Sequence, residues 1–204
     1  MSSLPSGTCH QISSSTKGVE MSEVSYPKEV IKDLIEGRLP WERVKSIISG
    51  YKDRDRFDKY VEILQEKMPW KEKILLPLTD ELYIVEKGND RIVKCSCGYE
   101  FGDYRENWKL KALMHVRETE EEIRELYPYP GAPDPHYCEI REYYCPGCGS
   151  QLEVESVPFG YPAIFDFLPD LDSFYSEWLG RPLKTRKEFK DLTEELTRKW
   201  GSEE

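Results

Sequence analysis

The strongest chemical signal in the sequence is a set of four cysteines arranged as two close pairs. Cys95 and Cys97 form the first pair, Cys145 and Cys148 form the second, and a glycine follows each pair. Four thiolates brought together in this way make the tetrahedral ligand set that zinc accepts in structural sites. The glycine permits the positive φ of a tight metal-binding turn and frees backbone N–H groups to point at sulfur. The spacing therefore predicts a zinc site, and Cys-x-x-Cys is its stronger half because Cys-x-Cys is a less common turn.

Other interpretations of these cysteines are a redox-active pair and ordinary buried thiols. We favour zinc over an iron–sulfur cluster because paired spacing suits a closed tetrahedral site, and a structural metal because four thiolates leave no position for water. Cys138 could replace one ligand, although we expect it to be a plain buried thiol, and His136 could also ligate. The 47 residues between Cys97 and Cys145 must fold as an insertion between the two turns.

Catalytic motifs are absent from the sequence. It contains no G-x-x-x-x-G-K-[ST] phosphate loop, no dinucleotide fingerprint, no G-x-S-x-G nucleophile elbow and no H-E-x-x-H motif. We therefore assign no catalytic and no cofactor-binding residues to this chain. His115 is expected on the wet face of a strand. Asp166, Asp170 and Asp172 could position a substrate or metal, but we expect turn hydrogen bonds and a helix cap, with Asp172 as the cap.

Length and charge restrict the class of protein. The chain has 204 residues, enough for one domain with a small appendage, and its net charge is −10. Proteins that bind nucleic acid usually carry the opposite charge, so we expect no nucleic-acid partner. No apolar run approaches the roughly 20 residues that cross a membrane, and the N-terminus does not have the pattern of a secretory signal. We expect a cytoplasmic protein that is not bound to a membrane.

The elements that must position the cysteines suggest an α+β fold. We expect an N-terminal helical segment packed on a zinc-ribbon-like antiparallel β module with an inserted strand and helix, followed by an extended aromatic arm and C-terminal helices. The expected boundaries are a disordered extension at 1–24, helices at 25–70, the β module at 71–157 with its insertion at 99–137, the aromatic arm and a short helix at 158–183, and an amphipathic tail at 184–204.

Local patterns within these segments make more specific predictions. Apolar periodicity predicts a helix from Pro27 that ends at Gly37 and a second from Trp41 that ends at Gly50, which should turn Trp41, Val44, Ile47 and Ile48 inward. A third helix should be capped by Asp53 or Asp55 and carry an apolar stripe from Phe57 to Leu64. Two strands at 82–85 and 91–94 should form a hairpin that delivers the first cysteine pair. Alternation over 108–116 predicts a strand with one buried face. A threonine at 119 with a glutamate at 122 predicts a capping box at the start of the inserted helix.

The aromatic arm is the stretch PFGYPAIFDFLP at 158–169. Four aromatic residues in nine, with prolines at both ends, are too many for so small a core. We expect the arm to be extended and to lie against another surface. That surface is either the helical layer of the same chain or a partner chain.

Longer runs of the sequence resemble the acetone carboxylase gamma subunit family, the small subunits of ATP-dependent ketone carboxylases. The runs are VKCSCGYEFGDYRENWKL at 93–110, EIREYYCPGCG at 139–149 and GYPAIFDFLPDL at 160–171, with shorter ones at 39–41 and 49–53. The similarity extends from about residue 26 to about residue 183. The N-terminal extension and the tail from residue 184 lie outside it.

The resemblance implies a hetero-hexamer with two copies of each of three chains. Two large hydantoinase-like subunits would bind ATP and Mn and carry out the chemistry, the conversion of acetone and bicarbonate to acetoacetate with release of AMP and phosphate. The small subunit would contribute a zinc site formed by Cys95, Cys97, Cys145 and Cys148. Related enzymes act on acetophenone. The alternative is a free-standing zinc-ribbon adaptor that binds other proteins.

Overall fold

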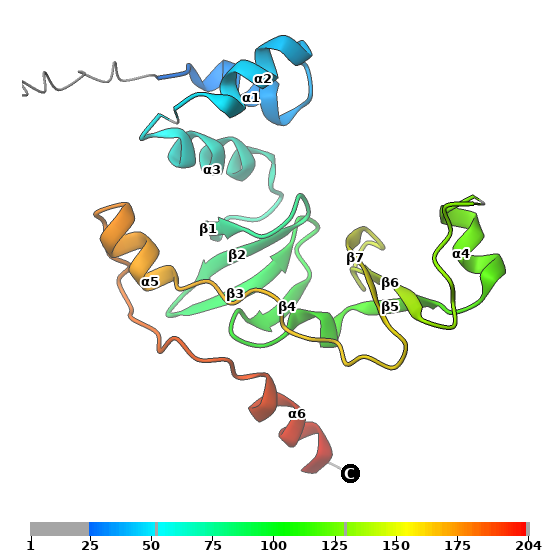
Figure 1. Cartoon of the computed structure of the whole chain (residues 1–204). Coiled ribbons are helices and arrows are strands. Elements are labelled where there is room, and N and C mark those ends of the chain that lie inside the picture. The colour runs from blue at the N-terminus through cyan, green and yellow to red at the C-terminus, as the bar shows by residue number, and fades with distance from the viewer. Residues whose placement is uncertain (1–24, 52, 129, 203–204) are drawn as a thin grey trace, which may run out of the picture. The chain divides into compact units, whose positions relative to one another are not determined.

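The computed structural model describes residues 25–51, 53–128 and 130–202, so the predicted disordered extension at 1–24 lies outside the described residues. The chain divides after Arg56 into two compact units. Helices and antiparallel strands both occur, which confirms the mixed α and β composition (Figure 1). No helix in the described part is both long and apolar enough to cross a membrane.

The first unit contains two short helices, α1 (Lys28–Ile35) and α2 (Trp41–Ser49), each preceded by a proline. Proline suits this place because its fixed φ fits a helix start and it lacks the N–H that the first turn cannot pair. Ile31 and Ile47 are buried, as predicted. The prediction that Trp41 and Ile48 point inward is wrong, because both side chains are mostly exposed. The apolar face of so short a helix is wider than the neighbouring protein surface that could cover it, so residues at its edges stay exposed.

The second unit begins with α3 (Arg56–Lys67) and a four-stranded antiparallel sheet in the order β1-β2-β3-β4. Its strands are β1 (Lys73–Pro77), β2 (Leu82–Lys87), β3 (Asp90–Cys95) and β4 (Glu100–Asp103). The predicted hairpin is confirmed, and Gly88 supplies the positive φ of its turn. Leu64 of α3 packs against this sheet. β4 was not predicted, because four residues that include a glycine give little strand signal.

A three-stranded antiparallel sheet in the order β5-β6-β7 completes the second unit. Its strands are β5 (Leu113–Arg117), β6 (Cys138–Tyr144) and β7 (Gln151–Pro158), and α4 (Glu120–Leu126) lies between β5 and β6. The capping box of α4 is confirmed: Thr119 accepts a hydrogen bond from the Glu122 N–H, and the Glu122 carboxylate accepts one from the Thr119 N–H.

The predicted strand over 108–116 is wrong in its first half. Trp108–Lys111 is a short 3-10 helix, η1, and only the residues from Leu113 onward form a strand. The side chain of Asn107 accepts a hydrogen bond from the Lys109 N–H at 3.1 Å, and this local bond favours a turn over a strand. The predicted burial is also wrong, because Met114 is half exposed whereas Lys109 is buried.

One hydrophobic core includes residues from both sheets of the second unit. Its centre is a series of edge-to-face aromatic pairs that runs from β4 through η1 to β6. Phe101 and Trp108 have ring centroids 5.9 Å apart, and Trp108 and Tyr143 have centroids 6.0 Å apart. Such pairs contribute about 0.5–1.5 kcal/mol each beyond the area they bury. The cysteines Cys95 and Cys145 lie in the same core.

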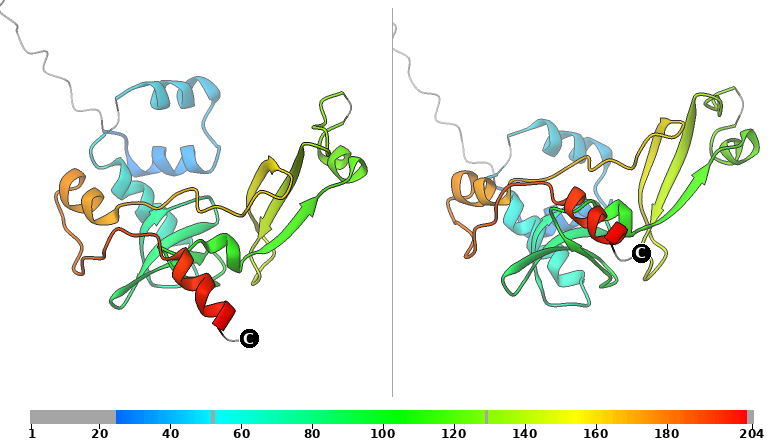
Figure 2. Two further views of the ribbon diagram at one scale, coloured as in Figure 1. Left: turned by 60° about the horizontal axis from the view of Figure 1, so that its bottom comes forward. Right: turned by 90° about the horizontal axis from the view of Figure 1, so that it is seen from below.

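The segment between β7 and the next helix has no regular secondary structure and passes beside the four-stranded sheet (Figures 1 and 2). It leads into α5 (Leu171–Ser173) and a single π turn, η2 (Phe174–Trp178). The prediction that Asp172 caps this helix is wrong, because Asp170 accepts the capping bond from the Ser173 N–H. The chain ends in α6 (Thr193–Ser202).

Asp172 instead holds the C-terminal segment to the sheet. Its carboxylate forms a two-point ion pair with the buried Arg91 of β3, at 2.7 and 3.0 Å, and accepts the Lys187 N–H at 2.9 Å. Burial alone would raise the pKa of Asp172, but these hydrogen bonds hold that pKa below its ordinary value. The carboxylate therefore stabilises the fold above its unfolded pKa of about 4, and this contribution is lost as the pH falls through the folded pKa.

We predict that Asp172→Asn lowers the free energy of unfolding by about 1.5–3 kcal/mol at pH 7, the usual contribution of a hydrogen bond to a charged group. The difference from wild type should shrink as the pH falls toward 3. Thermal unfolding followed between pH 7 and pH 3 measures this convergence. Asp90→Asn is the control, because the Asp90 carboxylate is mostly exposed in its pair with Lys187. Equal pH dependence of the two variants would contradict the role of Asp172.

Candidate metal centre

The second cysteine pair forms the turn between β6 and β7. The backbone N–H of Cys145 donates to the carbonyl of Ser150 at 2.9 Å, and the N–H of Gly149 donates to the carbonyl of Cys145 at 2.8 Å. Gly149 has a φ of 74°, as predicted for a residue that closes such a turn. The Gly147 N–H lies 3.4 Å from the Cys145 sulfur. The turn therefore presents both sulfurs and directs a backbone N–H at one of them.

The first pair forms the turn between β3 and β4. Because β4 pairs with β3, the shorter Cys-x-Cys sequence also lies in a complete hairpin. The Cys95 N–H donates to the Tyr99 carbonyl at 2.8 Å, and Gly98 has a φ of 102°. The indole N–H of Trp70 donates to the carbonyls of Cys95 and Ser96 at 3.2 and 3.0 Å. These bonds hold the turn in place from outside the hairpin.

The two turns face each other, and all four sulfurs lie within 4.8 Å of one another. The Cys95 and Cys148 sulfurs are 3.8 Å apart, and the Cys97 and Cys145 sulfurs are 3.7 Å apart. Four thiolates at the usual Zn–S bond length of about 2.3 Å occupy the corners of a tetrahedron with edges of about 3.8 Å. The spacing of the sulfurs therefore fits a tetrahedral zinc ion.

Close approach of the turns depends on a glycine. A β-carbon added to Gly147 would lie 3.0 Å from the β-carbon of Tyr99 and 3.3 Å from the sulfur of Cys97. Neither neighbour is the free end of a flexible side chain, so a larger residue would push the turns apart. This role of Gly147 could not be predicted from the sequence. Glycines in turns are recognised by the positive φ that a turn requires, whereas Gly147 is needed for its contacts with a second turn.

The four thiols differ in their burial and in their hydrogen bonds. Cys95 and Cys145 are buried, whereas Cys97 and Cys148 are exposed. Burial raises the pKa of Cys95 and of Cys97. Hydrogen bonding to Ser150, whose hydroxyl lies 3.3 Å from the Cys148 sulfur, lowers the pKa of Cys148 to about 7. A bound cation is the usual means by which buried thiols in such a group are deprotonated together.

The other candidate ligands lie elsewhere. Cys138 begins β6 and Cys145 follows its end, which separates them by about 20 Å at the usual rise per residue. The Cys138 sulfur faces the carbonyl of Asp134 at 3.7 Å, and the His136 ring pairs with the Asp134 carboxylate at 2.9 Å. His136 is largely exposed. The structure therefore brings neither residue to the four sulfurs.

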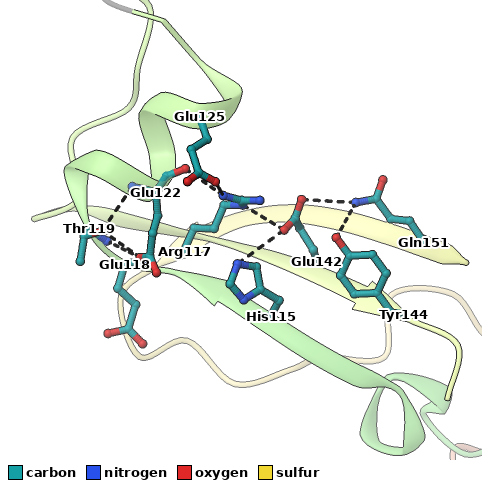
Figure 3. A network of polar contacts seen from close by, with 9 residues as sticks. All are labelled: His115, Arg117, Glu118, Thr119, Glu122, Glu125, Glu142, Tyr144 and Gln151. Carbon is teal, nitrogen blue, oxygen red and sulfur yellow. Dashed lines mark hydrogen bonds and ion pairs between the residues drawn. The ribbon is translucent and has the colours of Figure 1, made fainter. Parts of the chain in front are cut away.

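Two acidic residues of α4, Glu122 and Glu125, belong to a local polar network that also includes His115 of β5 (Figure 3). Arg117 pairs with Glu142 at 2.9 Å and with Glu125 at 2.6 Å, and Gln151 donates to Glu142 at 3.3 Å. His115 is half exposed, as predicted for the wet face of its strand, and lies 4.0 Å from Glu142. This network joins α4 to the three-stranded sheet through side chains that pair with one another.

Lys109 is a prominent buried residue that the sequence analysis missed. Its side chain is almost fully buried, and its ammonium group contacts Glu153 and Glu155 at 2.8 Å each and also Asp166. Burial opposes the charged form of Lys109, but the hydrogen bonds that it donates to these carboxylates outweigh burial and raise its pKa. Its partners are 44 to 57 residues away in the chain, so no local pattern could have revealed them.

Residues 68–179 match the family model described as acetone carboxylase gamma subunit. The chain belongs to this family. It is 45% identical over 165 residues to the acetone carboxylase gamma subunit of Xanthobacter autotrophicus, which covers 80% of this chain and 98% of that protein. It is 31% identical over 112 residues to the acetophenone carboxylase beta subunit of Aromatoleum aromaticum, which covers 54% of this chain and 80% of that protein. The resemblance seen in the cysteine runs and the aromatic arm is thereby confirmed.

We predict that Cys148→Ser releases zinc from the chain and lowers its melting temperature. Structural zinc sites in small peptides bind with apparent free energies of about 10–16 kcal/mol, so loss of one ligand removes a large stabilising term. Metal analysis and thermal unfolding of the purified chain measure both effects. Cys138→Ser is the matched control and should retain the metal. Full zinc occupancy in Cys148→Ser would show that the ligand assignment is wrong.

A second prediction concerns Gly147→Ala. The added methyl group should force the turns apart and weaken zinc binding while all four cysteines remain. Competition with a chromogenic chelator measures the change in affinity, and we expect a loss of at least about tenfold, equivalent to about 1.4 kcal/mol. Gly131→Ala is the control, because the nearest atom to its added β-carbon is 3.7 Å away. Unchanged affinity in Gly147→Ala would mean that the turns have room to separate.

Proposed function

We propose that this chain is the small zinc-binding subunit of a multisubunit, ATP-dependent ketone carboxylase. The observation that supports this most strongly is the 45% identity to an acetone carboxylase gamma subunit over 98% of the length of that protein. Similarity over almost the whole of a relative supports a shared role more strongly than a shared motif does. The match to an acetophenone carboxylase subunit extends the support to ketone carboxylases as a group.

In this proposal the chemistry takes place on two large hydantoinase-like partner subunits. These would bind ATP and manganese, and the complex would contain two copies of each of the three chains. ATP would activate the ketone and bicarbonate by phosphorylation, and with acetone the products would be acetoacetate, AMP and phosphate. Selection between acetone and a larger ketone would also belong to the large subunits.

The proposed role of the small subunit is structural. Its four cysteines would hold zinc in a closed tetrahedral site, which leaves no open position for a substrate or an activated water. Buried cations are also paired within the chain: Lys109 with three carboxylates and Arg91 with Asp172. Charged groups that are buried and paired in this way are poorly placed to act as general acids or bases.

We predict that the chain co-purifies with two large subunits from its native host, and that the complex fixes labelled bicarbonate into an oxoacid only with a ketone and ATP present. Acetone and acetophenone are the ketones to compare, and omission of ATP is the control. If the chain elutes alone with its zinc and the fraction shows no ATP-dependent carboxylation, the proposal fails. That result would favour a free-standing zinc-ribbon adaptor.

A further inference from the structure

The aromatic arm is fixed to its own chain by three buried polar side chains. Arg141 donates to the carbonyl of Tyr161, Asn107 donates to the carbonyl of Ala163 at 3.0 Å, and Lys109 pairs with the Asp166 carboxylate. All three side chains are nearly inaccessible to water. The arm therefore has a defined path along the second unit, although it contains no helix or strand.

The side chains of the arm divide into two sets. Phe165 and Leu168 pack against the core that the two sheets share. Four large apolar side chains of the arm are instead exposed, and we call this set the arm face: Phe159, Tyr161, Ile164 and Phe167, with exposed fractions of 66%, 43%, 43% and 58%. Because polar anchors already hold the arm, the arm face is not needed to fold it. Exposed apolar side chains gathered on one segment are typical of a surface that binds a partner.

A small pocket lies beside Phe167. Its volume is about 90 Å³, and its walls include Trp108 and Phe165, the acidic residues Glu153 and Asp166, and Lys109, which pairs with both of them. Aromatic walls with carboxylates at the rim suit a basic side chain, whose apolar stem packs on the rings while its charged end meets the carboxylates. A guanidinium group fits such a site best, because it is planar and can bond a carboxylate at two points.

Charge around the pocket supports the same conclusion. Lys109 pairs there with three carboxylates, those of Glu153, Glu155 and Asp166, and Arg141, which also approaches Glu155, is paired with Glu139. The cluster therefore carries two uncompensated negative charges. Burial disfavours the charged form of Glu153 and so raises its pKa. A further cation at the pocket would stabilise the charged carboxylate.

We infer that the arm face is where a large carboxylase subunit docks, and that the pocket beside Phe167 receives an arginine side chain of that subunit. The inference rests on the proposed function, which supplies the large subunits. A second copy of this chain is a poor occupant, because each copy carries a net charge of −10. The extension at 1–24 is also a poor occupant, because it contains no arginine.

Phe167→Ser tests the apolar part of the surface, with Phe189→Ser as the matched control. Phe189 is a phenylalanine of nearly equal exposure, 57%, that lies outside the arm. Each full-length variant is expressed with the large subunits, and its affinity for them is measured. We expect Phe167→Ser to weaken association at least tenfold, as at a central interface residue, and Phe189→Ser to leave it unchanged. Neither variant should shift the melting temperature of the isolated chain by more than about 1 °C.

Asp166→Asn tests the charged part, with Glu177→Gln, an exposed acidic residue beyond the arm, as its control. We expect Asp166→Asn to weaken association, because it weakens the Lys109 anchor of the arm and removes an ion pair with the partner. Only the loss of the pair with the partner should also reduce the dependence of association on salt, so that dependence is the deciding measurement. The control should keep both the affinity and the salt dependence of wild type.

The outcomes separate this inference from the proposed function. If wild-type chain fails to bind the large subunits, the proposed function is wrong. If wild type binds and Phe167→Ser binds equally well, the function stands and the docking surface is wrong. Equal losses in Phe167→Ser and Phe189→Ser, or unfolding of isolated Phe167→Ser, would also overturn the inference.

Discussion

The approach of two hairpin turns until their four cysteine sulfurs lie within 4.8 Å of one another is the constraint on which the second unit depends. Its two sheets, of four and three consecutive antiparallel strands, are joined by a core whose centre is one series of aromatic pairs. The sulfurs lie 3.7 to 3.8 Å apart across the two turns, and this spacing depends on the separation of the sheets and is helped by Gly147, where a β-carbon would lie 3.0 Å from that of Tyr99. A metal at this point would hold the sheets together in addition to the core that they share, and zinc often stabilises small domains in this way.

Buried polar residues supply the second set of constraints. Arg91 and Lys109 each hold a distant segment of the chain through carboxylates, and Asn107 holds the arm through a carbonyl. Burying such groups costs free energy that their ion pairs and hydrogen bonds only partly recover. These residues fix the position of the segments that they bind. An apolar contact would let an extended segment slide, whereas directional bonds to particular backbone and carboxylate oxygens would not.

The features that could be predicted from the sequence are those whose causes are local. A turn glycine, a capping box and alternation within one hairpin each depend on residues a few positions apart, so the cysteine turns, α4 and β2–β3 were predictable. The failures have distant causes. The sequence pattern favoured Asp172 as a helix cap. In the structure Asp172 binds Arg91, which is 81 residues away, and Asp170 caps the helix instead. Alternation over 108–116 looked like a strand, but Lys109 is buried by carboxylates from β7 and from the arm.

The same geometry connects the cysteine site to the arm. β7 begins just after the second cysteine turn, and two of its residues, Glu153 and Glu155, point to the same face of the sheet. Both contact Lys109, which in turn holds Asp166. Displacement of the turn would therefore move β7 and change the position of the arm. A metal at the proposed site would in this way set the shape of the arm surface, and the proposed structural subunit would thereby govern the assembly of an enzyme.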